Sequence, residues 1–263
     1  MSAPTVIVLA GQRAGVVNPL AERAGVSHKC LVPVGGKPLI LHVIDVLARL
    51  SPRPEVLVSV EPEAHGELAV LLADYVQDGL PIAFVASARN LAQSVLIAAQ
   101  GCPGPIVVTT ADNVLLTAAS IERVLAELKQ SQAVACMASE AAVKAVHPEA
   151  QRNFYKFRDG GYANCNLYGL AGPAALGAIQ VFREGGQFQK NPKRLITAFG
   201  PINMLLVRMG WVTLQGAMKL ASRRFGLTFR ALVFGDGSAA VDVDNERTYA
   251  IAEMVLNRRT SAG

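Results

Sequence analysis

The sequence predicts a Rossmann-like α/β/α fold, in which one mostly parallel sheet lies between two layers of helices and the second half carries a hairpin and helical insertion. Short apolar runs rich in β-branched residues alternate with helical patterns through the first half of the chain, as expected of parallel strands buried on both faces. Hydrophobic residues make up 51% of the chain and charged residues 17%, which provides a sizeable core and argues against long disorder. The 263 residues permit one large or two small domains, and we expect a single domain over 1–263.

The first strand is predicted at 6–10, and a polar loop follows it. This loop holds Gly11, Arg13 and Gly15. Glycines let a backbone approach phosphate closely, and free N–H groups in such a loop can face an anion. The loop therefore indicates an anion-binding turn at the carboxyl end of the first strand.

Two lysines, Lys29 and Lys37, flank a Pro/Gly turn that leads into a predicted helix at 39–47. Pro38 stands where a first helical turn tolerates proline. Lysines beside a glycine loop, at the end of a first strand, indicate a polyphosphate site. The stretch is not a P-loop, because no Gly-x-x-x-x-Gly-Lys-Ser/Thr occurs in it.

The later elements follow from hydrophobic periodicity and from Pro/Gly breaks. Strands are predicted at 55–60, 81–87, 106–110, 133–138, 227–234 and 239–243, and a hairpin at 154–158 and 162–170. Helices are predicted at 63–76, 90–100, 118–130, 174–182, 194–209, 213–225 and 246–256. Ligands of parallel sheets collect beyond the carboxyl ends of the strands, so we expect the loops after the first, third and fourth strands at one site.

Several polar residues stand at the ends of these elements. Asp112 follows a buried strand, where a lone carboxylate is costly unless it is paired or bound to metal; a turn formed by Asp112 and Asn113 is the alternative. Asp242 and Asp244 alternate along a strand end, although Asp244 could instead cap the last helix. Asn164 and Asn166 face one side of a strand and could bind hydroxyl groups or form an exposed polar edge.

The stretch 6–44 resembles the signature of nucleotidyltransferases that join an NTP to a phosphorylated small molecule. This superfamily contains sugar-phosphate nucleotidyltransferases and the molybdenum-cofactor guanylyl- and cytidylyltransferases. Its pattern Lys-x-Leu-x-x-x-x-Gly-Lys-Pro-Leu is matched by Lys29, Leu31, Gly36, Lys37, Pro38 and Leu39. The first half of the signature departs, because Gln12 replaces a second glycine and Arg13 comes early. The resemblance covers 6–116 and a closing motif at 241–250.

The resemblance implies a nucleotide-diphospho-sugar transferase type of fold and a role for each matching residue. It implies that Asp112 and Asp242 bind Mg²⁺, with Asp244 as an alternative ligand or cap. It implies phosphate contacts for Lys29 and Arg13. Lys37 would contact a phosphate or stabilise its turn.

The nucleotide would contact residues of the first loop and the helix start near 90, namely Leu9, Ala10, Gly11, Asn90 and Ser94, although Asn90 is also a sound helix cap. The acceptor would contact Asn164 and Asn166, and the region 140–229 would carry acceptor specificity.

Composition limits the other classes of function. The net charge of +5 suits an anionic substrate. The sequence contains no Lys/Arg run with interleaved aromatic residues, which makes nucleic acid the weaker option. Four widely spaced cysteines without a Cys-x-x-Cys pair argue against a zinc or redox site. We expect a cytoplasmic protein. The apolar and basic stretch 194–225 could be core, the favoured interpretation, or a dimer interface or a peripheral membrane surface.

We therefore expect a Mg²⁺-dependent nucleotidyltransferase that acts on a sugar, polyol or lipid-precursor phosphate. Molybdopterin guanylyl or cytidylyl transfer is an alternative. A glycosyltransferase of related fold is another, although it would normally carry Asp-x-Asp where this chain has Ala111-Asp112-Asn113. A non-catalytic nucleotide-binding regulator is the third. The sequence identifies neither the base nor the acceptor.

Overall fold

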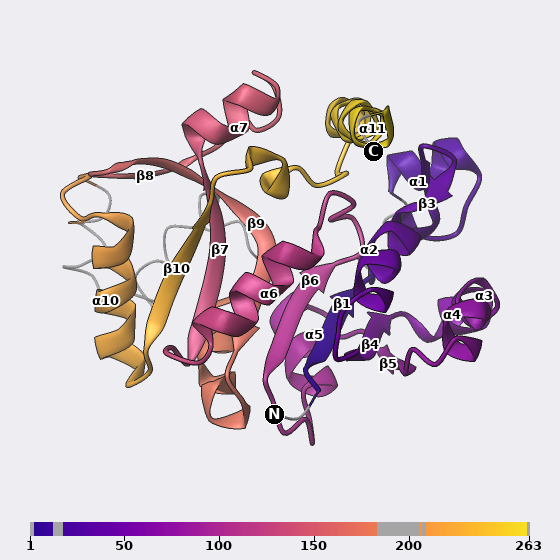
Figure 1. Ribbon diagram of the computed structural model, residues 1–263, viewed down its shortest axis with the longest axis horizontal. Coiled ribbons are helices and arrows are strands. Elements are labelled where there is room, and N and C mark those ends of the chain that lie inside the picture. Colours follow the sequence, from indigo (N-terminus) through magenta and orange to yellow (C-terminus); the bar gives the residue numbers. More distant parts are fainter. Residues whose placement is uncertain (1–2, 13–17, 183–205, 207–208, 262–263) are drawn as a thin grey trace.

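A mostly parallel sheet of eight strands forms the centre of the molecule, and helices cover both of its faces (Figure 1). The computed structural model describes residues 3–12, 18–182, 206 and 209–261. The strand order is β10-β7-β9-β6-β1-β4-β5, and β8 pairs with β9. The carboxyl ends of the parallel strands meet at one edge, beyond which α1, α7 and α11 lie (Figure 1).

The strands closely follow the predicted runs. They are β1 (Thr5–Leu9), β4 (Glu55–Val60), β5 (Ile82–Ala86), β6 (Ile106–Thr110), β7 (Ala133–Ser139), β8 (Tyr155–Phe157), β9 (Gly160–Leu170) and β10 (Phe229–Phe234), with a separate pair β2 (Pro33–Val34) and β3 (Lys37–Pro38). Pairs β1–β4, β1–β6, β4–β5 and β7–β10 are parallel. The central strands β1, β4 and β6 are rich in Val and Ile because they are buried on both faces, whereas the edge strands β5 and β10 are partly exposed.

Most of the described helices follow the sequence pattern, but α1 and α7 were not predicted from it. They are α1 (Pro19–Ala24), α2 (Leu39–Ala48), α3 (His65–Leu71), α4 (Ala73–Gln77), α5 (Leu91–Ala98), α6 (Ala118–Glu127), α7 (Glu140–Val146), α10 (Leu214–Phe225) and α11 (Glu246–Ser261). Short 3₁₀ helices are η1 (Lys29–Leu31), η2 (Pro62–Ala64), η3 (Pro173–Phe182) and η5 (Gly237–Ala240). Three predictions differ: the helix at 63–76 is broken at Leu72, 174–182 is 3₁₀, and 239–243 is not a strand.

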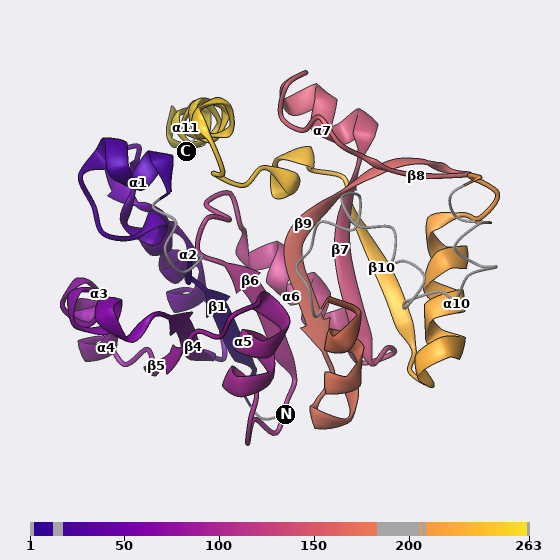
Figure 2. The same ribbon diagram turned by 180° about the vertical axis from the view of Figure 1, so that it is seen from behind.

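The core consists of two apolar layers, one on each face of the sheet. Alternate residues of β1 separate them, because Val6 and Val8 pack in the layer under α2 and α6, whereas Ile7 packs in the layer under α5 and η3. Figure 2 shows α5 on the face opposite to α6. This arrangement confirms the predicted α/β/α layers.

Strand β9 is inserted antiparallel between β6 and β7, as Figure 2 also shows. Leu170 pairs with Ile106 of β6 and with Ala133 of β7. The hairpin of β8 and β9 was predicted from its Asp-Gly-Gly turn. Its second strand completes the main sheet, so the hairpin places its polar residues next to the carboxyl end of β6.

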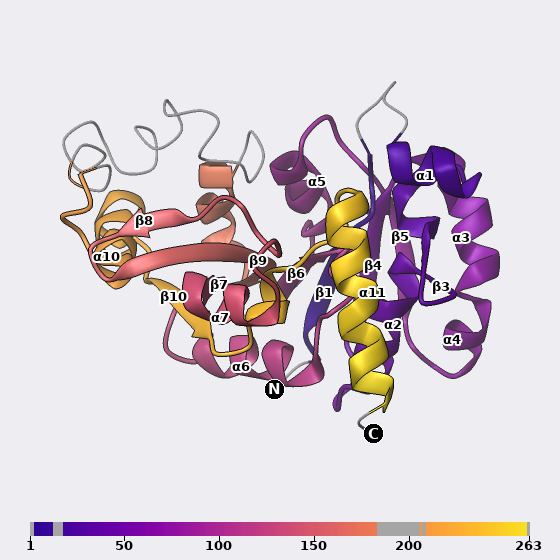
Figure 3. The same cartoon turned by 90° about the horizontal axis from the view of Figure 1, so that it is seen from above.

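The end of the chain crosses the carboxyl edge of the sheet. Figure 3 shows α11 in front of the sheet, with β6, β7 and β9 on one side of it and α1, α2 and α3 on the other. Tyr249 donates from its hydroxyl to the carbonyl of Pro33, and Arg259 donates to the carbonyl of Leu115. These bonds tie α11 to β2 and to the loop that follows β6.

Part of the expected helical pair at 194–225 is described. The helix α10 packs along β10, and Leu214, Ala217 and Ala221 are buried, which agrees with a core role for this part. Residues 194–205, 207 and 208 lie outside the described residues. No helix among the described residues is long and apolar enough to cross a membrane.

Candidate functional site

A cavity of about 580 Å³ opens at the carboxyl ends of β1 and β6. Its lining joins residues that are far apart in the sequence: Leu9, Ala10, Gly11, Lys29, Asp112, Asn164, Asn166, Asp242 and Asp244 are among them. The structure therefore brings together most of the residues that the sequence singled out. It does so at the edge of the sheet where ligands of parallel sheets bind.

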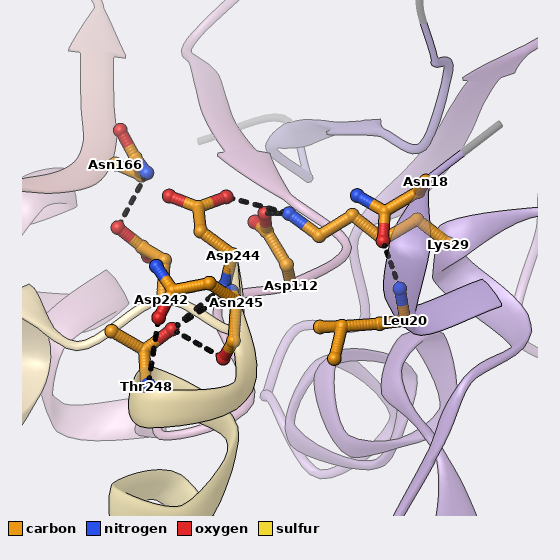
Figure 4. Close-up of polar contacts among 9 residues, drawn as sticks. All are labelled: Asn18, Leu20, Lys29, Asp112, Asn166, Asp242, Asp244, Asn245 and Thr248. Atoms are coloured by element: carbon orange, nitrogen blue, oxygen red, sulfur yellow. Dashed lines mark hydrogen bonds and ion pairs between the residues drawn. The ribbon is translucent and has the colours of Figure 1, made fainter. Parts of the chain in front are cut away.

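Lys29 forms the centre of a charged cluster in this cavity (Figure 4). Its Nζ donates to Asp112 Oδ2, and it also donates to Asp244 Oδ1 at 2.6 Å. Burial by itself would lower the pKa of the Lys29 ammonium, but the charges of Asp112 and Asp244 outweigh burial and raise that pKa above its usual value. Lys29 therefore remains a cation throughout the neutral range.

Asp112 is held at the end of β6 from two sides. Its carbonyl accepts from the backbone N–H of Val243 at 3.2 Å, which ties the C-terminal segment to this strand end. Burial would raise the pKa of the Asp112 carboxyl, but Lys29 holds it below its usual value. The neighbouring Asn113 is buried and donates to Thr109 Oγ1 and to the Cys165 carbonyl. Asp112 is thus an ionised carboxylate on a rigid support.

Asp242 is buried next to this pair, with 5% of its surface exposed. Its Oδ2 accepts from Asn166 Nδ2 at 2.7 Å (Figure 4). Burial, together with the negative charges of Asp112 and Asp244, raises the pKa of the Asp242 carboxyl well above its usual value. An additional positive charge at this point would therefore be strongly favourable.

Two carboxylate oxygens in this cluster fit a hard cation. Asp112 Oδ1 and Asp242 Oδ1 are buried and have no hydrogen-bond partner among the described residues. Mg²⁺ is usually held by one or two carboxylates together with water and substrate phosphates. No three His, Cys, Asp or Glu side chains in the described chain form a metal-binding group, so a cation here would need ligands from a bound phosphate or from water.

Asp244 differs from Asp242 in its surroundings. Its side chain is 61% exposed and pairs with Lys29, and its backbone N–H donates to Thr248 Oγ1 at 2.9 Å. Asn245, in turn, accepts from the Thr248 N–H and so caps α11 (Figure 4). Asp244 thus pairs with Lys29 next to the helix start, while Asp242 points into the buried cluster.

The glycine loop begins at the floor of the cavity. A Cβ on Gly11 would lie 3.0 Å from Glu61 Oε1 and from Ser87 Cβ, so a side chain here would require these two neighbours to shift. Glu61 accepts from the Gln12 N–H at 3.0 Å and from Ser87 Oγ at 2.9 Å. Glu61 thus anchors the loop. Glu61 was not predicted from the sequence, although a carboxylate directly after a buried strand was the available signal. Arg13 and Gly15 lie outside the described residues.

Three of the predicted residues are absent from the cavity lining formed by the described residues. The ammonium of Lys37 pairs with Asp45 of α2, which agrees with the alternative that it stabilises its turn. Asn90 accepts from the Gln93 N–H at 3.0 Å and caps α5. Ser94 is buried and accepts from the Ala88 N–H at 2.8 Å. Leu91, between these two, does line the cavity.

The hairpin side of the cavity is polar and uncharged. Asn164 and Asn166 line it, and Asn164 Nδ2 donates to Asn166 Oδ1 at 2.8 Å. Gln151, Asn153 and Tyr155 also line it. Gln151 and Asn153 were missed because the pattern before the hairpin is irregular, although their position directly before a strand was a usable signal. Tyr155 lies within the predicted hairpin strand and in β8, but its role in the cavity was not predicted.

Both the sequence and the structure resemble those of known proteins. Residues 6–180 match the family described as the MobA-like NTP transferase domain. A structure described as a hypothetical transferase from Thermus thermophilus is 26% identical, with a TM-score of 0.73, and the match covers 94% of this chain and 100% of that chain.

The structure of 4-diphosphocytidyl-2C-methyl-D-erythritol synthase from Anaerococcus prevotii is 11% identical, with a TM-score of 0.58, and the match covers 97% of this chain and 96% of that chain. This second likeness shows a shared fold. No curated protein matches the sequence significantly.

Proposed function

This chain belongs to the MobA-like NTP transferase family and is an enzyme of nucleotidyl transfer, and from this premise we propose that it joins an NTP to a sugar, polyol or lipid-precursor phosphate in the presence of Mg²⁺. The observation that carries the proposal is the meeting of Lys29 with Asp112, Asp242 and Asp244 in one cavity. A cation and paired carboxylates at the edge of a parallel sheet are suited to polyphosphate chemistry.

The proposed reaction needs no nucleophile from the protein. An oxygen of the acceptor phosphate forms a bond to the α-phosphorus of the NTP. The bond from this phosphorus to the oxygen that bridges to the β-phosphate breaks, and pyrophosphate leaves with the electron pair. Cys30 lines the cavity, but burial raises the pKa of its thiol to about 12, so it is not a thiolate at neutral pH.

Catalysis in this proposal rests on positioning and charge. Lys29 places its charged ammonium against the phosphates, and the backbone of Leu9, Ala10 and Gly11 lines the cavity next to them. Arg13 would contact the β/γ end. Asp112 and Asp242 would hold Mg²⁺ through their unpartnered oxygens. When bound, Mg²⁺ supplies Lewis-acid stabilisation of the charge on the reacting phosphate.

The acceptor is proposed to lie against the hairpin side of the cavity, within the specificity region 140–229. Gln151, Asn153, Tyr155 and Asn164 offer neutral hydrogen-bonding groups there. Among the described lining residues, Lys29 is the only cation. This environment suits a body rich in hydroxyl or amide groups, with its phosphate directed toward Lys29.

The test is a pyrophosphate-release screen with Mg²⁺, each of the four NTPs, and a panel of sugar, polyol and pterin phosphates. We expect release with one NTP and one acceptor, and none from Asp112→Ala, whose folding is checked by thermal melting. A pterin phosphate as the active acceptor would favour molybdopterin nucleotidyl transfer. NTP binding without release for any pair would favour the regulator, and full activity of Asp112→Ala would remove the metal assignment.

A further inference from the structure

Strand β9 contains an irregularity at the point where it passes the cavity. Ala135 of β7 pairs with Tyr168, but Met137 pairs with Asn164, so Cys136 alone stands opposite residues 165–167. Within this bulge Asn166 has a φ of 45°. It is the only residue other than glycine with positive φ in the described chain. Bulges of this kind re-aim a side chain beside functional sites.

The bulge directs the Asn166 amide onto Asp242. Asn166 Nδ2 donates to Asp242 Oδ2 at 2.7 Å, and Asn166 Oδ1 accepts from Asn164 Nδ2 at 2.8 Å (Figure 4 shows the first of these bonds). An ionised carboxylate only accepts, and Asn166 Oδ1 already accepts from Asn164, so the NH₂ end of Asn166 faces Asp242. Both ends of this amide are therefore already used within the protein.

The consequence for Asp242 is an orientation with one oxygen held and the other free. Oδ2 is bonded to Asn166, and the buried Oδ1 has no hydrogen-bond partner among the described residues. Asp242 follows η5, in a segment that forms no strand. It therefore depends on side-chain contacts for its direction more than a residue within a strand would.

We propose that Asn166 is a positioning residue, which holds Asp242 by its Oδ2 so that Oδ1 faces the bound Mg²⁺, with Asn164 fixing the Asn166 amide. This inference rests on the proposed function for the metal, and it gives Asn166 a different task from the acceptor contact expected from the sequence. Groups that orient a metal-binding carboxylate tune metal affinity by about 10–100-fold.

The test compares Asn166→Gly with Asn153→Ala. Glycine adopts a positive φ without strain, so Asn166→Gly keeps the bulge and removes only the amide. Asn153 lines the same side of the cavity, and its variant is a matched control for loss of one neutral amide. Mn²⁺ binding is measured by titration calorimetry on the full-length proteins, with and without a non-reacting NTP analogue, and the KM for the acceptor is measured where turnover is found.

We expect Mn²⁺ to bind about tenfold or more weakly to Asn166→Gly, with an unchanged acceptor KM, and we expect the opposite pattern for Asn153→Ala. Unchanged Mn²⁺ affinity with a raised acceptor KM in Asn166→Gly would overturn the inference in favour of acceptor contact. Absence of Mn²⁺ binding by the wild-type protein in both conditions would overturn it as well. Mn²⁺ binding can be measured without turnover. The comparison of the two variants therefore still tests this inference if the pyrophosphate-release screen finds no active pair of NTP and acceptor.

Discussion

Replacement of Lys29 by methionine tests the charged cluster most directly. Lys29→Met keeps the aliphatic length but removes the ammonium that bridges Asp112 and Asp244. Removal of one partner from a buried ion pair costs about 3–5 kcal/mol. We take the lower end, about 3 kcal/mol, because Asp244 is 61% exposed and is solvated without its partner. In a domain of this size the melting temperature should fall by roughly 6–12 °C.

The stability lost in Lys29→Met should depend on pH, and it should be smaller in acid than at neutral pH. Burial opposes ionisation of Asp112, but Lys29 lowers its pKa in the folded protein. A lowered folded pKa stabilises the protein above the ordinary carboxyl pKa, and this contribution is lost as the pH falls through the folded value. The raised pKa of Lys29 contributes stability that persists until the pH rises through that value. The difference between wild type and variant should be full between roughly pH 5 and pH 10 and smaller near pH 3.

The assay is thermal unfolding followed by circular dichroism, in EDTA and then in Mg²⁺. Mg²⁺ should restore more stability to Lys29→Met than to wild type, since it supplies charge that the variant lacks. The matched control is Lys37→Met, which removes the pair of Lys37 with Asp45 away from the cavity lining. It should cost about 1 kcal/mol, with no extra response to Mg²⁺ and activity within a few-fold of wild type.

Three results would refute this reasoning. The first is an equal loss of stability in the Lys29 and Lys37 variants. The second is a Lys29→Met deficit that is the same at pH 3 and pH 7. The first result would mean that the ion pairs of Lys29 contribute no more to stability than the pair of Lys37 with Asp45, and the second would mean that the lost stability is not electrostatic. The third is a collapse of activity in Lys37→Met, which would favour the phosphate contact that the sequence suggested for Lys37.

Three further predictions concern the same cavity. Asp112→Asn should lower kcat by about 10²–10³-fold or more in the pyrophosphate assay, with Mg²⁺ binding lost; activity near wild type would contradict the assignment. Asp242→Asn should raise the melting temperature in EDTA by roughly 2–4 °C, and activity should be lost. Burial and nearby carboxylates raise the pKa of Asp242, so its ionised form destabilises the protein above the usual carboxyl pKa. A lower melting temperature would argue against this. Gly11→Ala should raise the KM for NTP about tenfold, since its Cβ would lie 3.0 Å from Glu61 and Ser87, and an unchanged KM would show that the loop does not meet the nucleotide.

Much of the fold could be predicted because local pattern determines it. Strands such as β1 and β6 are buried on both faces, and their apolar runs are visible without any knowledge of their partners. Asp112 could be found for the same reason, because a carboxylate after such a run needs a partner. Lys29 could be found because it belongs to a motif.

The insertion of β9 could not be predicted, because its partners Ile106 and Ala133 are distant in sequence. The segment 239–243 was misjudged for a related reason. It is apolar, yet Gly237 packs so closely on the backbone of Ala142 that a Cβ would lie 2.2 Å away. The chain turns there into η5 and does not continue as a strand.

The distinction between Asp242 and Asp244 also depended on the structure. Strand alternation would place both on one side, but the Asp244 N–H donates to the Asp242 carbonyl at 3.0 Å. This short turn breaks the alternation and sends the two carboxylates into different surroundings. The roles of Glu61 and of the bulge at Asn166 depend likewise on contacts between separate elements.

The position of β9 has a consequence for how the chain is made. Until residues 160–170 have left the ribosome, β6 lacks its neighbour on one side, and β7 has no place in the sheet. A nascent chain that ends before Gly160 therefore presents an open strand edge, which is a template for association with other chains. Synthesis must pass this point before β6 and β7 can join one sheet, so the long hairpin strand covers these two inner strand edges as well as shaping the cavity.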